Sequence, residues 1–340
     1  MKAKVALCAA FVVALLPAVA RAEDAAKVKL TLRTHWKAGD TVTRIAEESE
    51  KNAYKVTGAD GKVQDEGVTE KATNYTRVEK CLEADAAGHM TKGLVYFSEF
   101  AHVSGKDRDE SLKGVTIEVT GTGANTKWKV QGDTVLEDAA KGWVEQDLGP
   151  SDSADEVSET VSPKAEVAAG DAWEFDAKAI AAFFGKSLPV DPATATGKAK
   201  LEGLDGDVAT SQVEFEFQTK AFPSQTGALL PWAEGGKFAV KSRWVNKADG
   251  APAPATQSVE FLWAGKAKLS EGLQAEVTNS GKKEAKTVAG GEIPKPPEPP
   301  KPPAPDNPPP DKPAPDKPAP DKPPPDKPEP EKPAPDKPEK

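Results

Sequence analysis

Alternation of apolar and polar residues is the feature that most restricts how residues 23–293 can fold. The runs "VKLTLRTH", "GVTIEVTG" and "SQVEFEFQT" each place apolar side chains at alternate positions. Successive side chains of a β-strand point to opposite faces of a sheet, so these runs predict strands with one buried face. Turn-forming groups such as "GLDGD" and "NKADG" lie between such runs. The sequence therefore predicts a mainly β fold, an antiparallel meander that forms an open half-barrel or a sandwich.

Two segments have helical rather than strand spacing. Leu136, Ala140, Trp143 and Val144 recur at the intervals that place side chains on one face of a helix. Residues 176–185, "DAKAIAAFFG", have the same spacing and end in a glycine suited to a helix C-terminus. The sequence predicts a short helix in each segment.

The stretch between these helices, residues 149–163, is small, polar and acidic, with a proline near each end. Such a composition is typical of a linker or a long surface loop. It divides the body into an N-terminal β-rich half, residues 23–150, and a C-terminal β-rich half, residues 163–293. The alternative is one continuous domain.

The first 22 residues have the organisation of a secretory signal peptide. Lys2 and Lys4 precede an apolar run from Val5 to Val19, and Ala20 and Ala22 fit the small-residue rule for leader peptidase. We therefore expect cleavage after Ala22 and an exported protein, located in the periplasm or the extracellular cell envelope. No other apolar run approaches the length of a membrane span, so none is expected in the mature chain.

The C-terminal segment, residues 294–340, holds 23 of the 32 prolines in a drifting repeat, "PDKPA". Proline lacks an amide donor and fixes φ, so this segment cannot form a central strand or a helix interior. The expected form is a disordered, polyproline-II-rich rod that acts as a spacer or tether. Its mixture of proline, lysine and acidic residues resembles the envelope-spanning segments of TonB-like bacterial proteins.

Charge restricts the partners of the body. Residues 23–293 carry 33 Lys and Arg against 44 Asp and Glu, a formal charge of −11. Such a surface repels the phosphates of nucleic acids and anionic lipid headgroups. We expect no binding to nucleic acid or to the surface of an anionic membrane.

No segment carries a motif for catalysis or cofactor binding. His35, His89 and His102 lack the spacing of zinc ligands, and no cysteine cluster, HExxH or GxSxG occurs. We therefore expect no cofactor and no bound metal, and we assign no catalytic residue.

One apolar stretch without alternation, "GALLPWAEGG", is the candidate contact site. Leu229, Leu230 and Trp232 flank a proline and could form an exposed lip that touches a hydrophobic ligand or a protein partner. The alternative is a loop that these side chains pin into the core.

A short element links the central segment to a family. Pro163, Val167, Gly170, Asp171 and Trp173 form a P-x-x-x-V-x-x-G-D-x-W pattern followed by a β-rich half. In this the segment resembles a family of exported bacterial β-rich proteins. The resemblance implies no activity and no catalytic residue.

Two hypotheses follow for function. The first is a non-enzymatic envelope protein whose β-rich body binds an apolar ligand, an envelope protein or the cell-wall matrix, with the proline-rich tail as a spacer. The alternative is an enzyme that uses dispersed carboxylates, which would have to converge in a cleft of the folded chain.

Overall fold

The computed structural model describes residues 26–149, 154–185, 189–223, 229–270 and 272–294. All of them belong to one compact unit, Met1–Pro296, and a second unit comprises Pro297–Lys340. The predicted signal peptide, with Ala20 and Ala22, and the proline-rich tail lie outside the described residues.

The first half of the described unit is an antiparallel meander. Its strands are β1 (Thr41–Thr57), β2 (Val63–Ala84), β3 (Met90–Ser104), β4 (Asp107–Asp109), β5 (Thr116–Thr120) and β6 (Lys127–Val130). β1, β2, β3, β5 and β6 lie side by side in that order, and β4 pairs with β3 off this path. A short 3-10 helix, η1 (Gly123–Asn125), joins β5 to β6.

The second half is also an antiparallel meander. Its strands are β7 (Ala172–Glu174), β8 (Val190–Asp205), β9 (Val208–Pro223), β10 (Leu229–Lys247), β11 (Ala255–Ser270) and β12 (Leu273–Ala289). Each pairs antiparallel with the next along the chain, so β7 forms the second edge of the sheet.

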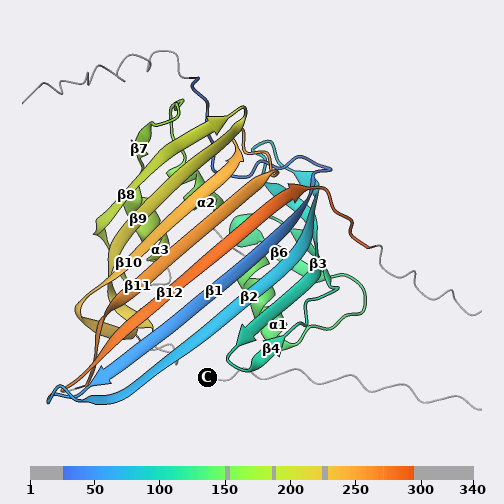
Figure 1. Cartoon of the computed structure of the whole chain (residues 1–340). Helices are drawn as coiled ribbons and strands as arrows, with labels where there is room; N and C mark the ends of the chain where they lie inside the picture. The colour runs from blue at the N-terminus through green and yellow to red at the C-terminus, as the bar shows by residue number, and fades with distance from the viewer. Residues whose placement is uncertain (1–25, 150–153, 186–188, 224–228, 271, 295–340) are drawn as a thin grey trace, which may run out of the picture. The chain divides into compact units, whose positions relative to one another are not determined.

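β1 and β12 join the two meanders into one twelve-stranded sheet (Figure 1). They pair antiparallel from Val42 with Ala289 to Thr57 with Gln274. We call this pair of strands the seam. The predicted mainly β, antiparallel fold is confirmed.

Among the described residues, three α-helices accompany the sheet: α1 (Asp138–Leu148), α2 (Ala154–Val161) and α3 (Ala177–Phe184). In Figure 1 the sheet lies in front of these helices. We call the helix-bearing face of the sheet the inner face and the opposite face the outer face. The two predicted helices correspond to α1 and α3, and α3 begins where the side chain of Asp176 accepts a hydrogen bond from the Ala179 amide, 3.1 Å away.

α2 lies in the stretch that its composition predicts to be a linker or loop. Val161 is only 2% exposed, and Val157, one helical turn earlier, packs against the same core cluster. Two valines at this spacing give the short helix one apolar face. Their signal is hidden in the sequence because the other residues of the segment are small, polar or acidic.

Residues 28–36, which we call the N-terminal segment, differ from the expectation of a strand. Val28 forms an isolated bridge with Val167, and the amides of Thr31 and His35 donate to the carbonyls of Ala248 and Gly250. Leu30 and Leu32 are buried, as their alternation indicates. The alternating side chains therefore reflect burial against the core, while the backbone bonds to loops instead of a neighbouring strand.

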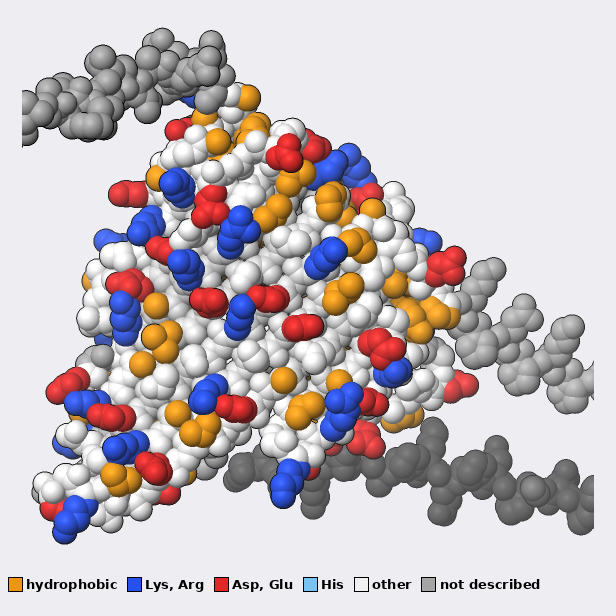
Figure 2. Space-filling view, viewed as in Figure 1, with side chains coloured by type: hydrophobic (Ala, Val, Ile, Leu, Met, Phe, Trp, Pro, Cys, Tyr) orange, Lys and Arg blue, Asp and Glu red, His pale blue; other side chains and the backbone are white. Residues whose placement is uncertain are grey.

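The two faces of the sheet have different surfaces. In β1, Val42 and Ala46 are buried against the inner side, whereas Ile45 is 44% exposed on the outer face. Figure 2 views the outer face, where acidic and basic side chains are interspersed with scattered apolar ones. The large apolar side chains gather on the inner face, between the sheet and its helices.

No helix within the described part of the chain combines the length and the apolar character needed to cross a bilayer.

Candidate binding groove along the seam

Inner-face side chains change character across the sheet. They are aromatic on both sides of the seam, in the sets Tyr75, Phe97 and Phe100 and Phe215, Phe217 and Phe238. In the middle of the seam the inner-face pairs are Arg44 with Thr287, Ala46 with Ala285, Glu48 with Lys283 and Glu50 with Gly281. This part of the seam is therefore a mostly polar strip between two aromatic regions.

A groove of about 870 Å³ lies over this strip, between α1 and the seam strands. Its apolar lining comes from Phe100, Trp143, Val259 and Phe261. Its polar lining includes Glu48, Glu50, Lys71, Thr73, His102, Asp109, Asp147 and Lys283. The volume falls within the range of small-molecule sites, about 300–1,000 Å³. We call this space the seam groove.

Trp143 of α1 forms one apolar wall. Its ring makes edge-on contacts with Tyr75, Phe97 and Phe100, at centroid distances of 5.6, 5.7 and 4.9 Å. The same part of the helix is held by Ala140 and Val144, which are fully buried. The wall is therefore rigid, while one side of the half-buried Trp143 faces the groove.

Phe261 of β11 forms the opposite apolar wall. A methyl group at Gly281 would lie 2.3 Å from the Phe261 ring, so the ring covers this glycine. Any larger residue at Gly281 would displace the ring. Because Gly281 of β12 has no side chain, the ring of Phe261 from β11 reaches the edge of the polar strip.

An ion pair between Glu48 and Lys283 lies on the floor of the groove, across the seam. The Lys283 ammonium is also 6.0 Å from the centre of the Tyr75 ring. Burial lowers the pKa of Lys283, but Tyr75 and the Glu48 carboxylate outweigh it and hold the pKa above its ordinary value. The floor therefore presents a fixed positive charge beside a carboxylate.

Glu50 offers a second carboxylate on this floor. Its Oε1 accepts from the side-chain amides of Asn52 and Asn279, at 3.0 and 3.1 Å. No described lysine or arginine forms an ion pair with it. The Glu50 carboxylate is thus oriented by amide donors and has acceptor capacity left for a ligand.

A buried chain of charges anchors α1 beside the groove. Glu79 Oε1 accepts from Arg44 and Arg77, at 2.9 and 2.6 Å, and Arg77 also binds Asp147 of α1. Burial alone would raise the pKa of Glu79, but the two arginines bring it down to about 2. Asp147 and Glu79 likewise overcome the effect of burial and hold the pKa of Arg77 well above its ordinary value.

The predicted lip, Leu229, Leu230 and Trp232, lies at the start of β10 and does not line the seam groove. Trp232 is half-buried, and its Nε1 donates to Thr219 Oγ1 over 2.8 Å. Leu230 packs against the cluster of Ala267, Ala275 and Val277, while Leu229 is 55% exposed. Two of the three side chains thus pack onto the sheet, and a contact role for the lip stays a prediction.

Two acidic side chains of the groove have basic partners. Within the described ranges, no group of three or more His, Cys, Asp and Glu side chains is placed to hold a metal ion. Glu48 is paired with Lys283 and Asp147 with Arg77. Both of these carboxylates of the groove are therefore already engaged by basic side chains.

Comparisons with known proteins place the chain near no characterised group. No family model matches it, and no curated protein matches it. A solved structure of lipovitellin, described by its lipid–protein interactions, is 6% identical with a TM-score of 0.36, over 76% of this chain and 26% of that one. The hydrocarbon channel TodX, as a deltaS2 mutant, is 7% identical with a TM-score of 0.24, over 75% of this chain and 91% of that one. These low scores carry no argument about ligand or function.

Proposed function

We propose that the body is a non-enzymatic binding protein that holds an apolar ligand, or an apolar side chain of a partner, in the seam groove. One observation carries this proposal: an open groove of about 870 Å³ lies between the rigid Trp143 wall and the Phe261 wall. Binding there would remove the exposed parts of both rings from water, which stabilises a complex by about 25 cal/mol for each Å² of apolar surface buried.

The charged floor restricts the ligand further. Lys283 and Glu50 lie close to the aromatic walls, so the favoured ligand carries a polar or charged group at one end of an apolar body. A purely apolar molecule should still bind between the two aromatic walls, but more weakly, because it leaves these groups with poorer hydration and no new partner. The proposal is therefore a ligand with both characters.

A titration with N-phenyl-1-naphthylamine, a fluorescent apolar probe, tests this proposal. Phe261→Ser removes an inner-face wall, and Leu262→Ser is the matched control on the outer face, where Leu262 is 44% exposed. We expect saturable binding that Phe261→Ser weakens by roughly tenfold and Leu262→Ser leaves unchanged. Absence of saturable binding, or equal loss in both variants, would overturn it.

We also propose that the protein works in the cell envelope, with residues 294–340 as its spacer. The features that support this are the signal-like N-terminus and the proline-rich tail. Deleting residues 294–340 should leave the melting temperature of the body unchanged and alter its retention in an envelope fraction. Loss of folding on this deletion would contradict the spacer role.

A further inference from the structure

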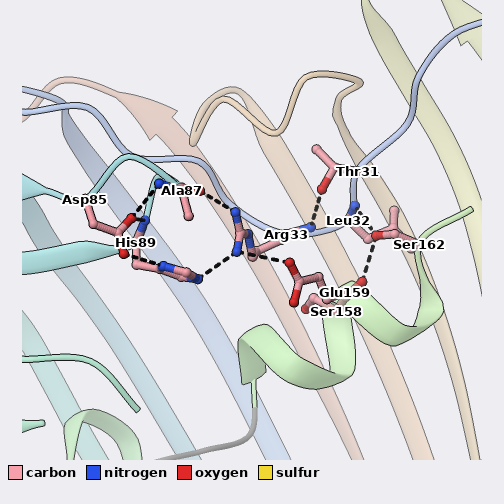
Figure 3. A network of polar contacts seen from close by, with 9 residues as sticks. All are labelled: Thr31, Leu32, Arg33, Asp85, Ala87, His89, Ser158, Glu159 and Ser162. Carbon is pink, nitrogen blue, oxygen red and sulfur yellow. Dashed lines mark hydrogen bonds and ion pairs between the residues drawn. The ribbon is translucent and has the colours of Figure 1, made fainter. Parts of the chain in front are cut away.

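A network of polar contacts ties the N-terminal segment to two other elements (Figure 3). Arg33 Nη1 lies 2.6 Å from His89 Nε2 and 3.4 Å from Glu159 Oε1. Arg33 Nη2 donates to the carbonyl of Ala87. Ala87 and His89 belong to the turn between β2 and β3, and Glu159 belongs to α2. One arginine thus joins three parts of the chain that are distant in sequence.

The contact between Arg33 and His89 requires a neutral imidazole. A guanidinium only donates hydrogen bonds, so His89 Nε2 must accept. His89 Nδ1 lies 2.7 Å from Asp85 Oδ2, and an ionised carboxylate only accepts, so the ring proton sits on Nδ1. A proton on Nε2 would remove the acceptor and place a second positive charge beside Arg33.

Arg33 has little freedom to find another partner. Its side chain is 7% exposed, and its Nε has no hydrogen-bond partner among the described residues. The other ties of the segment are uncharged, such as the Leu32 amide that donates to Ser162 Oγ at 2.9 Å. The Arg33 contact is therefore the tie of this segment that responds to protonation of the imidazole.

The N-terminal segment also closes one end of the seam. Beneath it is a cavity of about 60 Å³, whose walls include Leu32 and Arg33 from the segment and Arg44 and Ala285 from the seam. On β12, Ala285 is two residues from Lys283, so both side chains are on the inner face, and Lys283 lines the seam groove. The cavity and the groove thus follow one another along the same strip.

We propose that Arg33, His89 and Asp85 form a proton-controlled latch that holds the N-terminal segment over the end of the seam groove. At neutral pH the latch is closed and the cavity stays separate from the groove. As the pH falls, His89 gains a proton, the tie to Arg33 breaks, and the segment releases, which lengthens the groove. The regulatory part of this inference rests on the proposed function of the groove.

Charged groups from three parts of the chain lie near the His89 imidazole. Arg33 from the segment places a positive charge beside Nε2, and Asp85 from the same turn as His89 places a negative charge beside Nδ1. Glu159 from α2 is 68% exposed and acts mainly on Arg33, while His35 packs against the neighbouring Gly88. A proton on Nε2 would therefore face Arg33 and leave the Asp85 contact in place, so the contact that is lost is the one to Arg33.

Hydrogen–deuterium exchange of residues 28–36 in the full chain tests the latch directly. After correction for intrinsic rates, we expect protection at about pH 5 to be roughly tenfold lower than at about pH 7.5. In His89→Gln the side-chain oxygen accepts from Arg33 at any pH, so the difference should disappear. His102→Gln is the matched control and should keep it. Equal wild-type protection at both pH values, or a pH response retained in His89→Gln, would overturn the proposal.

Asp85→Asn provides a second, independent readout. Its amide oxygen still accepts from His89 Nδ1, but the neutral group no longer favours the imidazolium. We expect the midpoint of the exchange transition to move to lower pH, which a merely structural role of this turn would not produce. An unchanged midpoint would contradict the latch.

Probe titrations at the two pH values separate the latch from the groove. We expect the affinity for N-phenyl-1-naphthylamine to change at least about threefold between them in wild type and not in His89→Gln. Release of the segment without any probe binding would overturn the proposed function but would not contradict the latch. Release with equal probe affinity would overturn the coupling between latch and groove.

Discussion

The two meanders hold their helices by different physical means. The first binds α1 through Trp143 and through the buried charges of Arg77, Glu79 and Asp147. The second holds α3 through ring contacts, with Phe184 5.5 Å from Phe217 and 5.3 Å from Phe238. One half is thus sensitive to charge and the other to volume. Where the seam lines the groove, it carries Glu48, Glu50 and Lys283 and no aromatic side chain of its own, so this part of the strip is polar.

The largest expected effect is on the volume-sensitive half. Phe217 is 2% exposed and contacts Phe184 and Phe238, so Phe217→Ala leaves a cavity that its neighbours cannot fill. We expect the free energy of unfolding to fall by about 3–5 kcal/mol, nearly equally between about pH 5 and pH 8. Urea unfolding measures this free energy. Phe217→Leu, which removes less side-chain volume than Phe217→Ala, is the control. A loss of stability that depends strongly on pH would show that this half is also sensitive to charge.

The next effect belongs to the charge-sensitive half. Because the pKa of Glu79 is lowered to about 2, its ion pairs stabilise the fold above its ordinary titration range, and this contribution is lost as the pH falls toward 2. The contribution is on the order of 3 kcal/mol. We expect Glu79→Gln to be destabilised relative to wild type at neutral pH and the gap to narrow in acid. A gap that is constant with pH would contradict the assignment.

A smaller effect concerns a hydroxyl in the volume-sensitive half that serves two indoles. Thr219 Oγ1 accepts from the indoles of Trp232 and Trp263, at 2.8 and 2.9 Å. Thr219→Val keeps the shape but leaves both indoles without this acceptor, at a cost of about 2 kcal/mol. Thr219→Ser keeps the hydroxyl and should lose less. Equal stability of the valine and serine variants in urea would show that these bonds contribute nothing.

The smallest effect is expected on the outer face. Glu214 lies 3.2 Å from Lys198 and 3.5 Å from Lys241, in pairs that are open to solvent. We expect Glu214→Gln to change the free energy of unfolding by less than about 1 kcal/mol. Thermal melts at low and high salt measure it. A loss as large as that of Glu79→Gln would show that burial does not distinguish the two networks.

The fold was largely accessible from sequence because its signals are local. Alternation predicts strands, and the spacing of Ala140, Trp143 and Val144 predicts α1. The N-terminal segment was misleading because Leu30 and Leu32 alternate like a strand while the backbone bonds to loops. Alternation reports which side chains are buried and does not report what the backbone pairs with.

The groove was not accessible from sequence because it depends on a long-range pairing. Glu48 and Lys283 occur in charged runs that are also typical of a solvated face. Only the pairing of β1 with β12 brings them together and places them on the inner face. The sequence predicts Trp143 as an apolar helix residue, but its position beside the seam requires the tertiary fold. The lip at Leu229, in contrast, is visible in the sequence as an apolar run without alternation. Such a run does not indicate what its side chains contact.

We infer that ligands bind over the seam, next to Trp143, and tryptophan fluorescence reports on binding at this position. N-phenyl-1-naphthylamine should quench tryptophan emission on binding to the wild type. Trp143→Phe keeps an aromatic wall, so we expect binding to persist while the largest share of the quenching disappears. Unchanged quenching in Trp143→Phe, with saturable binding, would place the ligand elsewhere and contradict the claim.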